Sequence, residues 1–136
     1  MPPTRTFGAF ARQALSIGGR ALRRRCPNCG GAGIFSSWLR MVPRCQGCGL
    51  KLEREQGYRV GAYMLNIVVA ELVFVAILVG VVVATWPDPP WEWLTYGSAA
   101  AMIGLPIGFY PFAQTLFLGI DLLIHPPEGR DFEAVP

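Results

Sequence analysis

The first half of the chain lacks acidic residues, and none occurs before Glu53. Lysine and arginine show the opposite distribution, because eleven of the twelve lie at or before Arg59. This asymmetry excludes an evenly mixed surface and gives the first half a strong positive charge. Such a charge attracts anionic lipid headgroups and also nucleic acids, so its sign alone does not choose between these partners.

The chain also has few residues from which an enzyme active site could be built. Its only histidine is His125, and a histidine directly after an apolar segment is expected to be solvated. The sequence shows no set of serine, histidine and aspartate, no glycine motif for phosphate and no pair of acids beside a base. We therefore predict that the protein is not an enzyme.

We expect no signal peptide, because the first 25 residues lack a continuous apolar core and a small-residue cleavage site. This argues against secretion and hence against disulfides, which persist in oxidising compartments. The acid-free, arginine-rich opening also resembles a mitochondrial transit peptide, so organellar targeting stays open as an alternative.

The opening segment does have a helical distribution of apolar residues. At about 100° per residue, one arc of the helical wheel collects Phe7, Phe10, Ala11, Ala14, Leu15, Ile17, Ala21 and Leu22. Arginines and other polar residues fall opposite, as in helices that lie in a membrane interface. Gly18 and Gly19 weaken the helix by about 1 kcal/mol each. A frayed basic tail is the alternative interpretation of residues 1–25.

Two long apolar segments follow. Residues 61–86 carry one charge, Glu71, and at about 1.5 Å per residue they can cross a hydrocarbon core of about 30 Å. The second segment, residues 94–124, is longer than a straight crossing needs and contains Pro106 and Pro111. We expect kinks or tilt to absorb its excess length.

The connection between these segments, residues 86–93, combines three prolines, three tryptophans and two acids, and we predict a non-helical turn at a membrane surface. It lacks lysine and arginine, whereas the stretch before residue 61 is rich in them. The positive-inside rule then places both termini in the cytoplasm of a protein of the inner membrane. The tail, residues 126–136, is predicted to be flexible, because it is too short and too rich in proline and charge to fold by itself.

Four cysteines form two C-x-x-C-G pairs, Cys26 with Cys29 and Cys45 with Cys48. Cysteines at this spacing can bind one metal from a single tight turn, and the glycine after each pair permits the positive φ of such a turn. Two turns make a closed tetrahedral site with four sulfur ligands. We predict structural zinc; iron bound as in rubredoxins uses the same ligands and stays open.

The chain resembles the family catalogued as domain of unknown function 983. Three stretches carry the resemblance: CPNCGGAGIFSSWLRMVPRCQGCGL, EQGYRVGAYMLN and PFAQTLFLGIDLLIHPP. It covers about residues 25–127 and leaves out the basic arm and the tail. The resemblance implies a small bacterial zinc-ribbon membrane protein, with some members encoded near respiratory oxidase genes and no assigned activity.

Four residues with an amide or carboxyl side chain fall within the apolar segments: Asn66, Glu71, Gln114 and Asp121. A charged acid at the depth of Glu71 costs about 2.5 to 3.5 kcal/mol, so it requires protonation or a partner. Counting from the inner ends of both segments places Gln114 and Thr115 near Glu71 in depth and Asp121 near Asn66. One interpretation is therefore a protonated Glu71 that hydrogen-bonds to Gln114.

Small residues suggest a different packing of the two segments. One face of the first carries Ala62, Asn66, Val69, Val73, Ala76, Gly80 and Ala84, and one strip of the second carries Ala100, Gly104 and Gly108. If these faces pack together, Glu71 points away from its own helix pair, toward another subunit or a second copy. Both interpretations of Glu71 remain open at this point.

Taken together, the patterns predict a small α-helical membrane protein. Its expected parts are a basic amphipathic helix over residues 1–25, a four-cysteine zinc ribbon and connector over 26–57, a transmembrane hairpin over 58–125 and the tail. We expect an adaptor or accessory subunit of a larger membrane complex, for instance a respiratory one, or of a homo-oligomer, in contact with membrane lipids.

Two other functions are compatible with the sequence. Glu71 and Asp121 could serve a transport or proton-relay component, although two helices do not enclose a pore. The arginines and the ribbon could bind nucleic acid, but only Phe35 and Trp38 supply aromatic rings between the cysteine pairs, so we do not expect a nucleic-acid partner.

Overall fold

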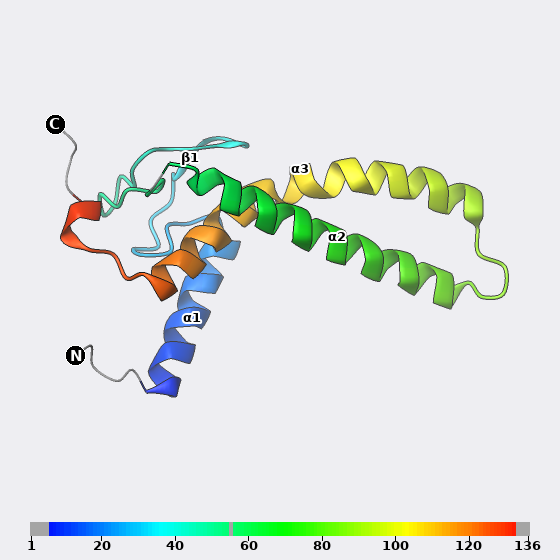
Figure 1. Ribbon diagram of the computed structural model, residues 1–136, viewed down its shortest axis with the longest axis horizontal. Helices are drawn as coiled ribbons and strands as arrows, with labels where there is room; N and C mark the ends of the chain where they lie inside the picture. The colour runs from blue at the N-terminus through cyan, green and yellow to red at the C-terminus, as the bar shows by residue number, and fades with distance from the viewer. Residues whose placement is uncertain (1–5, 55, 133–136) are drawn as a thin grey trace.

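The computed structural model describes residues 6–54 and 56–132, which form a small, mostly helical protein. Its elements, in chain order, are α1 (Phe7–Leu22), β1 (Phe35–Ser37), β2 (Arg40–Met41), α2 (Tyr58–Ala84), α3 (Trp91–Ile124) and the 3-10 helix η1 (Gly129–Asp131). The long helices α2 and α3 lie side by side, and every other element gathers around one end of the pair (Figure 1). We call this end the inner end.

Both α2 and α3 are long and apolar enough to cross a membrane. The 27 residues of α2 extend about 40 Å and the 34 residues of α3 about 51 Å. The prediction of a non-helical connection through residue 93 was wrong, because α3 begins at Trp91. The prolines end at Pro90, directly before the first helical residue, where a missing N–H breaks no helical hydrogen bond.

The excess length of α3 has a structural use that we did not predict. All of its buried residues lie in its inner half, from Tyr110 to Leu122. Leu118 and Leu122 share one hydrophobic core with the segment that carries the cysteines, including Ile34 and Leu50. The inner half of α3 is thus the scaffold on which the rest of the protein is built, and the helix bends between its inner and outer halves, as expected from Pro106 and Pro111 (Figure 1).

The segment with the cysteines, residues 26–52, is called the cysteine module below. Its two short strands are antiparallel, and the turn between them extends along α3 (cyan in Figure 1). The Trp38 indole in this turn donates a hydrogen bond to the Ile107 carbonyl at 3.0 Å. That carbonyl would otherwise lack a helical donor, since Pro111, four residues later, has no N–H. The indole N–H of the module therefore takes the place of the backbone donor that Pro111 lacks.

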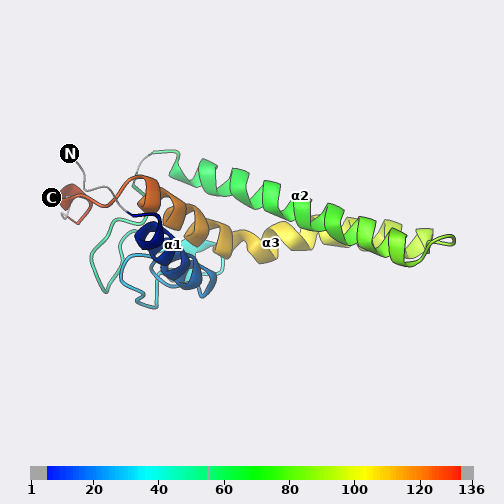
Figure 2. The ribbon, with the colours of Figure 1, turned by 90° about the horizontal axis from the view of Figure 1, so that it is seen from below.

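Helix α1 crosses the inner half of α3, and it is seen nearly end-on in Figure 2. Thr115 donates its hydroxyl to the Ala21 carbonyl at 2.8 Å. Gly119 permits close approach, because a Cβ there would lie 2.9 Å from Ile17 Cγ2. The frayed-tail interpretation is thus wrong for Phe7–Leu22.

The contact between α2 and α3 follows the predicted small-residue face only at the inner end, where Ala62 and Asn66 are buried. Further out the prediction was wrong, and residues of the predicted strips are exposed: Val73, Ala76, Gly80, Ala84, Ala100, Gly104 and Gly108. Instead, Phe74 and Leu78 of α2 border a cavity with Leu94 of α3. The contact follows a ridge of residues spaced four apart. Such a ridge is inclined to the helix axis, so it diverges from the straight face of small residues that we predicted.

Candidate functional site

The four cysteines of the module converge on one point. The Sγ atoms of Cys26 and Cys48 are 3.9 Å apart, and those of Cys29 and Cys45 are 3.6 Å apart. All four sulfurs lie within 4.8 Å of one another. In a tetrahedral site with metal–sulfur bonds of about 2.3 Å, sulfurs are separated by about 3.8 Å. The cluster therefore has the spacing to hold one metal ion, and its sulfurs are too far apart for disulfides.

Each cysteine pair sits in a tight turn that glycine makes possible. Gly30 donates its backbone N–H to the Cys26 carbonyl and Gly49 donates to the Cys45 carbonyl, both at 2.8 Å. Their φ angles are 78° and 74°, in the left-handed region where a side chain is disfavoured. The Gly31 N–H lies 3.3 Å from Cys29 Sγ and would stabilise a thiolate there. The turns thus orient all four sulfurs toward the same point.

The protonation of the thiols depends on their surroundings. Burial raises the pKa of the Cys26 thiol. Burial acts in the same direction on Cys45, but the backbone N–H groups of Cys48 and Gly47 outweigh it, and the pKa of Cys45 is lowered. Metal ligation requires thiolates, so binding of a cation by this cluster is coupled to release of protons.

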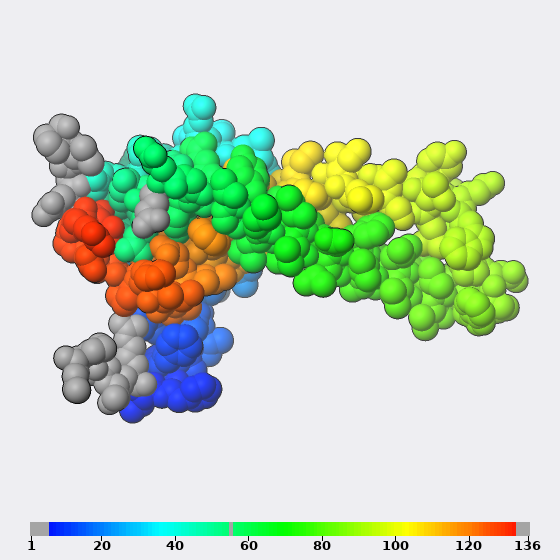
Figure 3. Space-filling model, in the orientation of Figure 1, coloured from blue at the N-terminus to red at the C-terminus, as the bar shows by residue number. Residues whose placement is uncertain are grey.

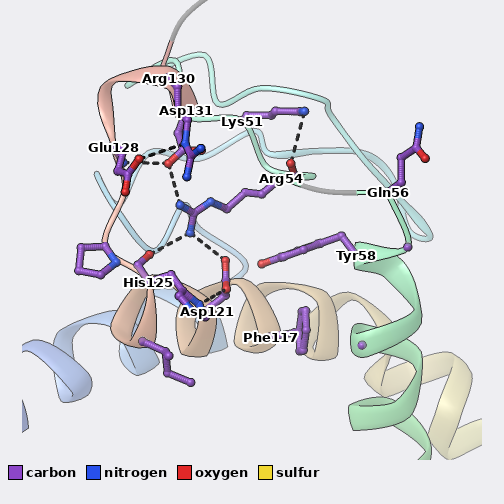
Figure 4. Close-up of a pocket in the computed structure, with 14 residues that line it drawn as sticks. Lys51, Arg54, Gln56, Tyr58, Phe117, Asp121, His125, Glu128, Arg130 and Asp131 are labelled. Atoms are coloured by element: carbon purple, nitrogen blue, oxygen red, sulfur yellow. Dashed lines mark hydrogen bonds and ion pairs between the residues drawn. The ribbon is translucent and has the colours of Figure 1, made fainter.

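A second cluster lies at the inner end, where Arg54 joins three segments of the chain. Its guanidinium contacts an Asp121 carboxylate oxygen of α3 at 2.9 Å and an Asp131 carboxylate oxygen of η1 at 2.7 Å. It also donates to the His125 carbonyl at 2.9 Å. The side chains of Arg54 and Asp131 are each only 11% exposed. Figure 4 shows this cluster beside a cavity of about 720 Å³.

The tail folds onto the module instead of extending freely. Asp131 accepts a hydrogen bond from the Glu128 N–H at 2.8 Å, and its carbonyl accepts one from the Lys51 N–H at 2.9 Å. We expected residues 126–136 to be too short and too polar to fold by themselves. The described part, through Phe132, is ordered by these contacts with Arg54 and Lys51; residues 133–136 lie outside the described chain.

The comparisons with known proteins identify a family. A sequence profile of one protein family matches residues 35–121, more than half of the chain. The chain belongs to this family, Protein of unknown function (DUF983). No curated protein and no solved structure matches it. The matched stretch includes the second cysteine pair, Arg54, all of α2 and α3 as far as Asp121, and it leaves out α1, the first cysteine pair and η1.

The polar residues predicted to lie within the membrane have separate surroundings. Gln114 is buried and its amide donates to the Tyr110 hydroxyl at 2.9 Å. Glu71 is exposed on α2, and among the described residues no hydrogen bond joins it to Gln114, whose Oε1 has no partner. Asn66 instead donates to the Pro106 carbonyl at 3.0 Å.

Asp121 is not near Asn66, contrary to our depth count, because it is paired with Arg54 and with His125, the latter at 3.1 Å. The count matched the inner ends of the two segments, but α3 extends past α2, and Phe117 rather than Ile124 lies against Gly61. Neither Arg54 nor Asp131 was predicted as a site residue. The sequence signal that pointed to such a cluster was Asp121, an acid at the end of an apolar segment that requires a cation as its partner.

Acidification should release the tail from the module. Burial raises the pKa of Asp131, but the Glu128 N–H and Arg54 outweigh it, so the pKa lies below its ordinary value of 3.8. A carboxyl whose pKa is depressed in the folded state stabilises that state above its unfolded pKa, and this contribution is lost as pH falls through the folded pKa. We expect lower hydrogen-exchange protection factors, relative to the intrinsic rate at each pH, for the amides of residues 128–132 below about pH 4.

The matched control for this prediction is Asp131→Asn, which removes the titrating group and keeps the exposed Glu128 and its pair with Arg130. The variant should exchange rapidly at all pH values, with a weaker response to acid. An identical acid response in both proteins would show that Asp131 is not the group responsible.

Proposed function

We propose that this protein is a membrane-anchored, non-enzymatic adaptor that presents a zinc-containing module at the inner face of a bacterial inner membrane and joins a larger membrane complex. The observation that carries this proposal is the fixed attachment of the module to α3. Trp38, Arg54 and the shared core with Leu118 hold the module from different directions. A module fixed in this way suits a binding surface of constant orientation.

We infer that the metal is structural zinc. Four cysteine sulfurs are the usual ligands of a structural zinc site and fill its tetrahedron, which leaves no position for water or substrate. The sulfur spacing and the two glycine turns support such a site. Iron would use the same ligands. Among the described residues, no other cluster of cysteine, histidine and acid has the spacing of a metal site.

Both termini should face the cytoplasm. In support, α1, the cysteine module and η1 lie together at the inner end, and the loop between α2 and α3 lies at the other end (Figure 1). Single cysteines introduced at Thr4, Asp88 and Glu133 should be labelled from outside intact cells only at position 88. Labelling at position 4 or 133 but not at position 88 would show the opposite topology, with the termini outside.

Glu71 is our candidate for contact with a partner within the membrane. It is exposed on α2 next to Leu72, which is 65% exposed, so the acid lies on the outer surface of the helix pair. We expect Glu71→Gln to keep a hydrogen-bonding group and retain native partners. Glu71→Leu should insert equally well but recover about tenfold less of them, since a polar contact in membranes contributes about 1–2 kcal/mol. Quantitative mass spectrometry after purification in mild detergent measures this.

Leu72→Ala is the matched control, because it changes an exposed neighbour without removing a polar group. Equal recovery of partners in all three variants would mean that Glu71 makes no such contact. A relay function would instead require a titrating group, so that even Glu71→Gln abolishes it. The pairing of Asp121 with Arg54 does not favour a relay through Glu71 and Asp121.

A further inference from the structure

Helix α1 has two neighbouring apolar stripes; the protein buries the C-terminal half of one and leaves the two leucines of the other exposed. The first stripe is Phe10, Ala14, Ile17 and Ala21. The second is Ala11, Leu15, Gly18 and Leu22. Ile17 and Ala21 pack on α3 and are 7% and 0% exposed, whereas Leu15 and Leu22 are 76% and 58% exposed.

The direction of the second stripe follows from helix geometry. Each of its members comes one residue after a member of the first stripe, hence about 100° further around the helix. Figure 2 views α1 from its N-terminal end, with the inner half of α3 above it. A right-handed helix turns clockwise as it recedes, so the second stripe faces the right, where α2 and α3 extend. This is the side of the bilayer if these helices span it.

The next face of α1 is polar. Arg12, Ser16 and Arg23 are exposed there, and each comes one residue after a member of the second stripe, hence about 100° further around the helix and nearly opposite the face that packs on α3. The helix also projects from the body of the protein as a separate ridge (blue in Figure 3) and crosses the direction of α2 and α3. An amphipathic helix in this orientation places its apolar stripe at the boundary between headgroups and acyl chains.

We propose that the stripe of Ala11, Leu15, Gly18 and Leu22 is a lipid-binding surface that holds α1 in the plane of the inner membrane interface. The proposal rests on the membrane insertion assumed in the proposed function. Because α1 packs against Gly119 and also joins the first cysteine turn through an Arg20 hydrogen bond to the Asn28 carbonyl at 2.7 Å, this contact fixes the height of the cysteine module above the bilayer.

The test uses the full-length protein in vesicles of phosphatidylcholine and phosphatidylglycerol. Photoreactive benzoylphenylalanine is introduced at Leu15, and at the exposed neighbour Ser16 as the matched control. Lipid adducts measured by mass spectrometry should be at least about tenfold more abundant at position 15, since burial of a leucine-sized side chain favours contact by at least that factor. The same group at Leu72 reports insertion of α2 independently.

Equal adduct yields at positions 15 and 16, or adducts with protein at position 15, would overturn the proposal while lipid adducts at position 72 leave membrane insertion intact. A failure at position 72 as well would overturn the proposed function and this inference together. Metal content of each variant, compared with that of the unmodified protein, confirms that the cysteine module is folded in the samples compared.

Discussion

Replacing Cys45 with serine should abolish metal binding and unfold the cysteine module while leaving α2 and α3 in the membrane. Cys45 is 1% exposed and belongs to the core as well as to the sulfur cluster. Apparent binding free energies of structural zinc sites are about 10–16 kcal/mol and contribute directly to folding. We expect near-complete loss of the metal by elemental analysis and loss of hydrogen-exchange protection over residues 26–52.

Ser36→Ala is the control, because Ser36 is an exposed residue of the same module whose hydroxyl donates to the Arg40 carbonyl. It should keep one metal per chain and lose at most about 1 kcal/mol. Retention of a full metal equivalent by Cys45→Ser would contradict the four-ligand site. Iron in place of zinc would preserve the site and overturn our assignment of the metal.

Replacing Arg54 with methionine should detach the tail and weaken the junction between the module and α3. The substitution keeps most of the apolar stem but leaves the carboxylates of Asp121 and Asp131 without the guanidinium that they share. Removing one partner of a buried ion pair costs about 3–5 kcal/mol, because the remaining charge is uncompensated. Denaturant unfolding in micelles, with hydrogen exchange of residues 126–132, measures the loss.

Arg59→Met is the matched control, since the pair of Arg59 with Glu53 is about half exposed and surface pairs contribute about 0–1 kcal/mol. Equal losses of stability from the two substitutions would show that the Arg54 cluster contributes no more to the free energy of unfolding than an exposed ion pair. Combining Arg54→Met with Asp131→Asn should cost less than the sum of the single changes, because the groups share one network.

Features encoded within a few residues were predictable from the sequence. The two C-x-x-C-G pairs predicted a cluster of four cysteines, and the apolar runs predicted two helices that can span a membrane. Both depend on local spacing: a tight turn brings two sulfurs together, and about 20 apolar residues suffice to cross a bilayer. The spacing does not identify the metal, since zinc and iron accept the same ligands.

Features that depend on how distant segments meet were decided only by the tertiary structure. Arg54 finds Asp121 and Asp131 across 67 and 77 residues of chain, and Trp38 finds the Ile107 carbonyl across 69. Hydrophobic periodicity shows that a residue faces a core but not which core. The sequence pattern therefore predicted a membrane span in the inner half of α3, although this half contributes to the core of the cysteine module. Its apolar residues satisfy either environment, and only packing against α1 and the module distinguishes the two.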